Sequence, residues 1–173
     1  MASIEGEFRR YRALAEGAFR QLSEAQLGQL TGAGDNSVAT IAWHVAGNLR
    51  SRFTDFLTGD GEKPDRDRDS EFLSRQLTHA ALLAFWSGGW DLLSAALADL
   101  SDLDLARTVT IRQQPLSVTE ALHRSLAHAS YHVGQIVFLA KQLCGPAWVS
   151  LSIPPGQSAA YNASPTHDRP PGS

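Results

Sequence analysis

Apolar residues recur every three or four positions in four long stretches of the chain, which is the pattern of amphipathic helices. The stretches cover residues 5–22, 38 to about 58, about 70 to 97, and 118–143. Each has a polar side opposite its apolar stripe, so each must bury that stripe against a neighbour. We therefore predict an all-α fold, a four-helix bundle.

Local signals mark several helix ends. Asn36 or Ser37 follows a run of turn formers and is predicted to cap the second helix, because its side chain can accept from free backbone N–H groups. Ser117 and Glu120 have the spacing of a capping box, which predicts the start of the fourth helix. Gly145, followed by proline, predicts its end.

The connections between these helices differ in character. Residues 59–71 contain a proline and no apolar side chain that could be buried in a core. This composition predicts a long crossover between the second and third helices. The segment 107–111, RTVTI, alternates β-branched residues and predicts a short strand or hairpin arm before the fourth helix. Gly88 and Gly89 interrupt the third helix and indicate a bend or a close packing contact.

The C-terminal part of the chain has its own pattern. Val149, Leu151 and Ile153 alternate with polar residues before two prolines, which predicts an extended tail packed on the bundle. The last residues carry no such pattern and are expected to be disordered. We therefore predict a single domain over residues 1–165 and a disordered tail over 166–173.

Composition narrows the function classes. The chain has 173 residues and a net charge of -3, which gives no basic field and argues against nucleic-acid binding. Cys144 is the only cysteine, so neither an intramolecular disulfide nor a cysteine zinc cage can form. The N-terminus lacks the apolar stretch of a signal peptide, and we find no 18-residue apolar run to span a bilayer. The expectation is a soluble cytoplasmic protein with no membrane partner.

Three of the six histidines are candidates for a metal site. His128 and His132 are four residues apart and so lie about 40° apart on the helix, where two imidazoles can chelate one divalent ion. His44 borders the apolar stripe of the second helix in the same way. If the second and fourth helices are neighbours, three nitrogens converge and leave coordination positions open, as in catalytic sites. The alternative is that these are packed, hydrogen-bonded side chains.

The other histidines and the cysteine are given different roles. His79 lies near the centre of the apolar face of the third helix and is interpreted as a core residue, with a fourth ligand or proton shuttle as the alternative. His123 is expected to face solvent, and His167 lies in the predicted tail. Cys144 is about three turns beyond His132, too far along the axis to bind the same ion.

Several polar residues flank the candidate ligands. Asn48, Arg52 and Asp55 share one edge of the second helix with its histidine, and Tyr131 and Gln135 lie beside the histidines of the fourth. They are candidates for hydrogen bonds to the ligands or for contacts with a substrate. Their alternative role is ordinary helix surface.

The segment 48–69 is densely charged. Its basic side chains are Arg50, Arg52, Lys63, Arg66 and Arg68. They form either solvated surface or, if the 59–71 loop closes over the mouth of the bundle, cations for an anionic substrate or a thiol carboxylate. The acidic run 65–69 is not a calcium loop, because Ser70 and Gln76 stand where an EF-hand needs Gly and Glu. Dinucleotide, nucleotide, serine-hydrolase and zincin motifs are absent from the sequence.

Two motifs resemble a known family. The segments AWHVAGN, around His44, and HASYHVGQ, from His128, resemble the DinB superfamily of metal-binding four-helix bundles. The likeness covers most of the chain. It is strongest to an uncharacterised branch with a motif like GNLRSRFTDFLTGDGEKPDRDRDSEF and a tail like LSIPPGQSAAYN. The resemblance implies that His44, His128 and His132 form the metal triad, in an up-down bundle with a long second-to-third helix crossover, and that the protein is a homodimer.

The resemblance also implies a range of activities. Characterised relatives include thiol S-transferases that use bacillithiol or mycothiol, a thiol-dependent isomerase, and metal-dependent hydrolases. We hypothesise a divalent ion, Zn²⁺ first and Ni²⁺, Fe²⁺ or Mn²⁺ as alternatives, that activates a thiol or water nucleophile. Transfer of a low-molecular-weight thiol to a small electrophilic substrate is the first choice. Hydrolysis is the second, and a noncatalytic metal-binding or interaction protein is the third.

Overall fold

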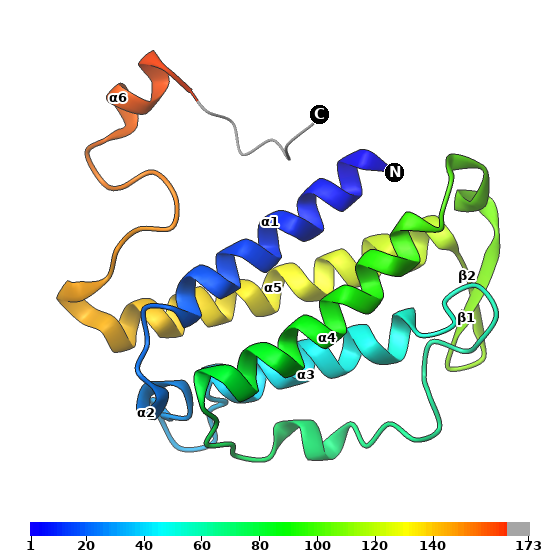
Figure 1. The fold of residues 1–173 in the computed structure, drawn as a ribbon, viewed down its shortest axis with the longest axis horizontal. Helices are drawn as coiled ribbons and strands as arrows, with labels where there is room; N and C mark the ends of the chain where they lie inside the picture. The colour runs from blue at the N-terminus through cyan, green and yellow to red at the C-terminus, as the bar shows by residue number, and fades with distance from the viewer. Residues whose placement is uncertain (166–173) are drawn as a thin grey trace.

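The chain is described here by a computed structural model that covers residues 1–165; the predicted tail at 166–173, with His167, lies outside the described residues. The fold is mostly helical, as predicted, and its long elements lie side by side (Figure 1). These are α1 (Ala2–Phe19), α3 (Val38–Phe53), α4 (His79–Ala98) and α5 (Val118–Cys144). Helix α1 packs against α5 and α4, and α3 packs against α4 and α5.

Shorter elements connect or follow the long helices. They are α2 (Glu24–Leu27), the 3₁₀ turns η1 (Asp69–Phe72), η2 (Asp102–Ala106) and η3 (Gly145–Ala147), strands β1 (Thr108–Ile111) and β2 (Gln114–Ser117), and α6 (Ser158–Ala163). The two strands form an antiparallel hairpin in which Val109 pairs with Leu116. The predicted hairpin arm before the last long helix is therefore confirmed.

Helices α3 and α4 run in the same direction. Trp43 stacks on Phe85 with ring centroids 3.5 Å apart, and Ala46 lies against Gly89, so residue numbers rise together along the two helices. The expected up-down arrangement is therefore wrong for this pair of helices, because the crossover over residues 54–78 carries the chain back before α4 begins. A Cβ on Gly89 would lie 2.5 Å from the Ala46 carbonyl oxygen, which confirms the predicted close packing contact.

The core contains tryptophans of α4 and phenylalanines of α1. Phe19 meets Trp86 edge-on with ring centroids 5.2 Å apart, and Phe8 meets Trp90 in the same way at 6.3 Å. All four side chains are almost fully buried. Burying large aromatic rings removes much apolar surface from water, and this holds the helices together.

Several ends of the first three long helices differ from the bounds predicted from the sequence, and at the start of α4 a capping side chain accounts for the difference. The second long helix ends at Phe53 rather than near 58, and the third begins at His79 rather than near 70. The Oγ1 of Thr78 accepts from the N–H of Ala81 and starts α4 there, so Phe72 lies in a 3₁₀ turn and not on the helix face. The first helix covers residues 2–19 and not 5–22.

The predicted signals at two other ends are confirmed. The hydroxyl of Ser37 accepts from the N–H of Thr40, 3.1 Å away, and caps α3. Ser117 and Glu120 form the reciprocal capping box that starts α5, and Gly145, with a φ of 55°, follows its last residue.

Helix α4 corrects one expectation. By length and composition alone it is apolar enough to cross a membrane, although no such run was found from the sequence. A single helix of this kind is weak evidence, because core helices of soluble proteins pass the same test. Here Trp86 and Trp90 of α4 are part of the core.

The segment after α5 packs on the other helices only at its start. The N–H of Val149 donates to Oε1 of Gln21 at 2.8 Å, and Leu151 lies against Gly17. The side chains of Val149 and Ile153 are nevertheless exposed, and α6 stands apart from the long helices (Figure 1). The prediction of an extended tail packed on the bundle is met in part: Trp148 and Leu151 pack against the core, whereas Ser158–Ala163 form a helix instead of extended chain.

Candidate metal centre

Three histidines meet where α3 crosses α5. His44 comes from α3, and His128 and His132 come from successive turns of α5. The Nε2 atoms of His44 and His128 are 3.1 Å apart, and one ligand nitrogen from each of the three residues lies within 4.8 Å of the others. Nitrogens that share a tetrahedral ion at about 2.1 Å lie about 3.4 Å apart. The three rings are therefore close enough to hold one metal ion.

Hydrogen bonds on the far side orient two of these rings. The Nδ1 of His44 lies 2.7 Å from Oε2 of Glu71, and the Nδ1 of His132 lies 2.7 Å from Oε1 of Gln135. Both oxygens accept, so each Nδ1 carries the proton and each Nε2 keeps a free lone pair. The Nε2 of His132 is buried and has no partner among the described residues. This unpartnered nitrogen fits a metal ligand.

Glu71 was not identified from the sequence. Its carboxylate is buried, holds His44 and also receives two hydrogen bonds from Arg66, at 2.8 and 2.9 Å. Burial alone would raise the pKa of Glu71, but the hydrogen bonds from His44 and Arg66 outweigh it and lower that pKa. No helical spacing links Glu71 to His44, so no pattern in the chain could have found it.

Two histidines of α5, His128 and His132, have lowered pKa values, which favours their neutral form. Burial, with the positive charge of the neighbouring histidines and arginines, lowers the pKa of His128 to about 3. Burial also lowers the pKa of His132 to about 4, against the opposing effect of the hydrogen bond to Gln135. A neutral imidazole is the form that binds a metal ion.

A cavity of about 260 Å³ opens beside the three histidines. It is lined by His44, Asn48, Arg52, Arg66, Arg68, Phe72, Arg112, Arg124, Ser125, His128, Tyr131 and His132. Five of these residues are arginines, and none is an aspartate or glutamate. The wall is therefore strongly positive.

Some of the predicted flanking residues line the cavity, and one does not. Asn48 is buried and lines the cavity. Arg52 also lines the cavity, and its guanidinium binds the carboxylate of Glu62. Tyr131 is exposed at the cavity, with its ring centroid 4.1 Å from that of His132. Asp55 is exposed, has a φ of 49° and lines a different hollow, so it is not part of the site.

The charged crossover contributes to the cavity in part. Arg66 and Arg68 line it, as the loop hypothesis requires. Lys63 and Arg50 do not line it: both border a separate hollow, and Arg50 lies over the ring of Phe85.

Four further residues of the wall were missed. Arg124 and Ser125 precede His128 by four and three residues, so helical spacing alone could have placed them beside it. Phe72 lies with its ring centroid 4.6 Å from that of His44. Arg112 lies at the hairpin tip, where the folded path of the crossover brings it into place.

Asp60 holds the hairpin tip against the crossover. Its carboxylate accepts from the backbone N–H groups of Arg112 and Gln113, at 2.8 and 2.7 Å, and from that of Glu62. Backbone hydrogen bonds lower the pKa of Asp60 to about 2. Arg112 and Gln113 both have positive φ, so this carboxylate stabilises an uncommon turn that positions Arg112.

The remaining candidates lie elsewhere. His79 is the first residue of α4 and half-buried rather than central, because the helix begins there; its Nε2 lies 3.2 Å from the carbonyl oxygen of Phe19. His123 is exposed. The thiol of Cys144 donates to the carbonyl oxygen of Gln21 at 3.3 Å. None of the three lines the cavity.

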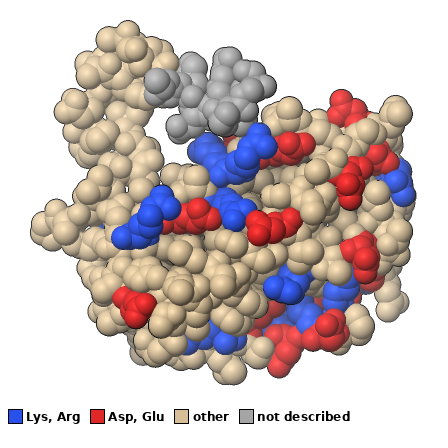
Figure 2. Space-filling model, viewed as in Figure 1, with Lys and Arg blue, Asp and Glu red and all other residues tan. Residues whose placement is uncertain are grey.

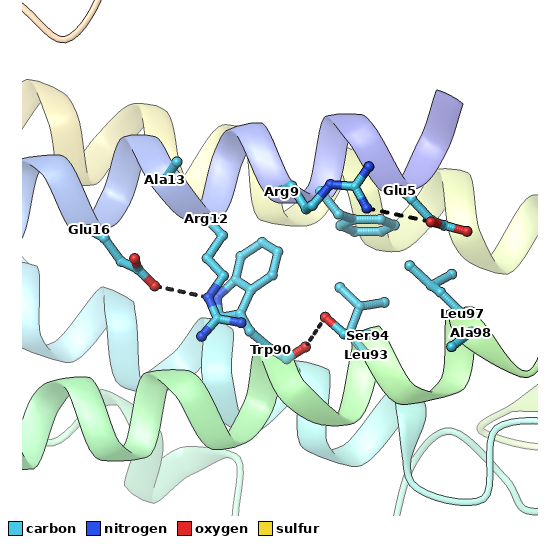
Figure 3. Close-up of a pocket in the computed structure, with 11 residues that line it drawn as sticks. Glu5, Arg9, Arg12, Ala13, Glu16, Trp90, Leu93, Ser94, Leu97 and Ala98 are labelled. Carbon is cyan, nitrogen blue, oxygen red and sulfur yellow. Dashed lines mark hydrogen bonds and ion pairs between the residues drawn. The ribbon is translucent and has the colours of Figure 1, made fainter. Parts of the chain in front are cut away.

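A second hollow lies between α1 and α4, away from the histidines (Figure 3). It has a volume of about 480 Å³, and its floor contains Phe8, Trp90, Leu93 and Leu97. None of the histidines among residues 1–165 lines it.

A mostly helical fold in which buried histidines converge beside an arginine-lined cavity defines a candidate metal-binding protein. The family described as "protein of unknown function (DUF1572)" has a model that matches residues 1–157. The chain belongs to this family. Neither the comparison with curated proteins nor the comparison with solved structures found a match.

Proposed function

We propose that this chain is a metal-dependent enzyme of the DinB superfamily, built as a four-helix bundle, that transfers a low-molecular-weight thiol to a small electrophilic substrate. The observation that carries the proposal is the convergence of His44, His128 and His132, with the buried Nε2 of His132 left without a partner in the part of the chain that the structure describes. The packing of α1, α3, α4 and α5 and the long crossover agree with that superfamily.

The chain's own residues have distinct roles in this proposal. His44, His128 and His132 hold the ion, while Glu71 and Gln135 accept the Nδ1 protons and so keep two of the rings in the binding orientation. When bound, a divalent ion such as Zn²⁺ lowers the pKa of a thiol or water and supplies a nucleophile at neutral pH.

The composition of the cavity favours a thiol over water as the nucleophile. Hydrolysis requires proton transfer to the leaving group, which is commonly performed by a carboxylic acid, yet no aspartate or glutamate of residues 1–165 lines the cavity. A thiolate needs no base once it has formed. Cys144 lies outside the cavity, so the sulfur comes from a second small molecule.

Zinc binding tests the metal site directly. Protein purified without a histidine tag and stripped of metal is titrated with Zn²⁺ by calorimetry, as wild type, His128→Ala and the matched control His123→Ala on the same helix. We expect one tight site in wild type and control, and a loss of affinity of more than about 100-fold in His128→Ala. Equal, weak binding by all three proteins would overturn the proposal.

Turnover tests the chemistry. Zinc-loaded wild type is assayed with low-molecular-weight thiols and a set of electrophiles, and separately with esters and amides. Thiol consumption that is lost in His128→Ala supports the transferase. Hydrolysis without thiol consumption establishes the hydrolase instead, and tight zinc binding with turnover in neither assay establishes a noncatalytic metal protein.

A further inference from the structure

The arginines of the cavity wall differ in how their charge is balanced. Arg52, Arg66 and Arg112 all contact the carboxylate of Glu62, at 3.0 to 3.4 Å. One carboxylate therefore serves three guanidinium groups, and it lies behind the wall rather than in the cavity. Arg66 also binds Glu71.

The positive charges of the other two arginines of the wall, Arg68 and Arg124, are balanced even less by nearby carboxylates. Arg68 reaches the carboxylate of Asp69 only at 3.9 Å, and its guanidinium lies over the ring of Phe72. Within residues 1–165, Arg124 makes no hydrogen bond or ion pair. It is exposed and one helical turn from His128, so its five N–H donors are free at the mouth of the cavity.

The positive wall is a local feature of the molecule. The chain carries a net charge of -3, and Figure 2 shows acidic and basic residues interspersed on the face seen there. Among the described residues no aspartate or glutamate lines the cavity, and the carboxylate of Glu71, which supports His44, is engaged by His44 and Arg66. A divalent ion at this site would lie among guanidinium groups with no anion from the protein in contact with it.

We propose that the cavity binds a small oxyanionic molecule, a carboxylate or a tetrahedral oxyanion, through Arg124 and Arg68, and that this anion and the metal ion bind cooperatively. Planar guanidinium groups bind such anions by paired N–H···O contacts. The inference rests on the proposed function for its metal partner and names the substrate class of that site: one reactant carries a carboxylate or similar anion. A cavity of about 260 Å³ lies just below the range for drug-sized ligands, so the molecule is small.

Two titrations separate this inference from the proposed function. Metal-free protein is titrated with succinate, with sulfate and with the neutral control succinamide, and Zn²⁺ affinity is then measured with and without saturating anion. Succinate and sulfate distinguish a carboxylate from a tetrahedral oxyanion. The variants are Arg124→Gln and a matched control, Arg20→Gln, which is exposed and not part of the cavity.

We expect at least one anion to bind, succinamide not to bind, and Arg124→Gln to weaken anion binding about tenfold or more while Arg20→Gln leaves it unchanged. Zinc affinity should rise at least about fivefold with the anion in wild type, and less in Arg124→Gln. No anion binding to wild type, or equal binding to Arg124→Gln, overturns the inference even if zinc binds. Anion binding in a protein that fails to bind zinc overturns the proposed function and the cooperativity, and retains the anion site.

Discussion

Two of the hollows, the groove between α1 and α4 and the cavity beside the histidines, differ in how charge is arranged around them. Between α1 and α4, Arg9 pairs with Glu5 and Arg12 with Glu16, both on the rim of an apolar floor (Figure 3). In the cavity between α3, α5 and the crossover, arginines line the wall and the carboxylates that balance them, chiefly that of Glu62, lie behind it.

The larger hollow is therefore the less suited to polar chemistry. The charged side chains on the rim of this groove are paired, and the buried polar atom of its floor that has no partner among the described residues is Trp90 Nε1, an indole donor that cannot bind a metal ion. The smaller cavity contains an unpartnered imidazole nitrogen and an unpaired guanidinium within the described residues. An unpaired charge and a nitrogen that can bind a metal ion, rather than volume, distinguish the candidate site from a packing groove.

The largest effect on stability is expected in the apolar floor of the groove between α1 and α4. Trp90→Ala removes a buried ring that packs on Phe8 and Trp86 and should lower the free energy of unfolding by about 3–5 kcal/mol. Zinc affinity of the folded protein should not change, because Trp90 does not line the cavity. Urea denaturation followed by circular dichroism, with zinc titration below the transition, measures both. A large loss of zinc affinity in the folded variant would contradict the separation of the two regions.

A smaller loss of stability, together with a loss of zinc affinity, is expected for Glu71→Gln. It leaves Arg66 without its buried partner, which should lower the free energy of unfolding by about 3 kcal/mol, and weakens the support of His44, which should reduce zinc affinity about 10- to 100-fold. Because the folded pKa of Glu71 is below its ordinary value of 4.5, its carboxylate stabilises the fold above pH 4.5, and this stability is lost as pH falls through the folded pKa.

The same denaturation experiment, repeated between pH 3 and 7, checks the pH dependence. Wild type should lose stability below about pH 4.5 more steeply than Glu71→Gln. Parallel pH profiles would show that this carboxylate has no special role in the fold.

Gln135→Ala should change zinc affinity and little else. Gln135 is exposed, so stability should be almost unaffected, but loss of its acceptor releases the Nδ1 of His132 and should weaken zinc binding about tenfold. Gln135→Glu is the matched control, since a carboxylate still accepts that hydrogen bond. If the alanine variant binds zinc as wild type does, the amide does not orient the ring.

The smallest effect is expected at the rim of the groove. Arg12 pairs with Glu16 and with Asp91, whose side chain is 67% exposed, and Arg12→Gln should cost less than about 1 kcal/mol. Thermal denaturation at low and high salt measures it, with a smaller difference between variant and wild type at high salt. A loss comparable to that of Glu71→Gln would contradict the contrast between a solvated rim and a buried wall.

The sequence predicted the parts of the fold that depend on local signals. Ser117, Glu120 and Gly145 define the ends of α5 by capping, and the turn formers before Ser37 define the start of α3. The start of α4 was misplaced because the apolar pattern extends back through Phe72, whereas the cap at Thr78 decides where the helix begins.

In the candidate site, too, the residues related by local helical spacing were predictable, and those placed by long-range contacts were not. Helical spacing was sufficient to pair His128 with His132 and to place His44 beside the apolar stripe of its helix, and the motif resemblance implied that the three form one site. Glu71 and Arg112 could not be predicted, because their positions depend on the path of the crossover and on its contacts with the hairpin. Arg124 could have been found, since it lies four residues before His128 on one helix.

The parallel course of α3 and α4 also has a consequence for the order of folding. The contact between His44 and His128 joins residues 84 positions apart, and the intervening chain includes the whole crossover and α4. Contacts of such long range form slowly, because the chain between them must first be ordered. The site is therefore expected to assemble among the last steps of folding, and an ion held there would slow unfolding by joining two distant parts of the chain.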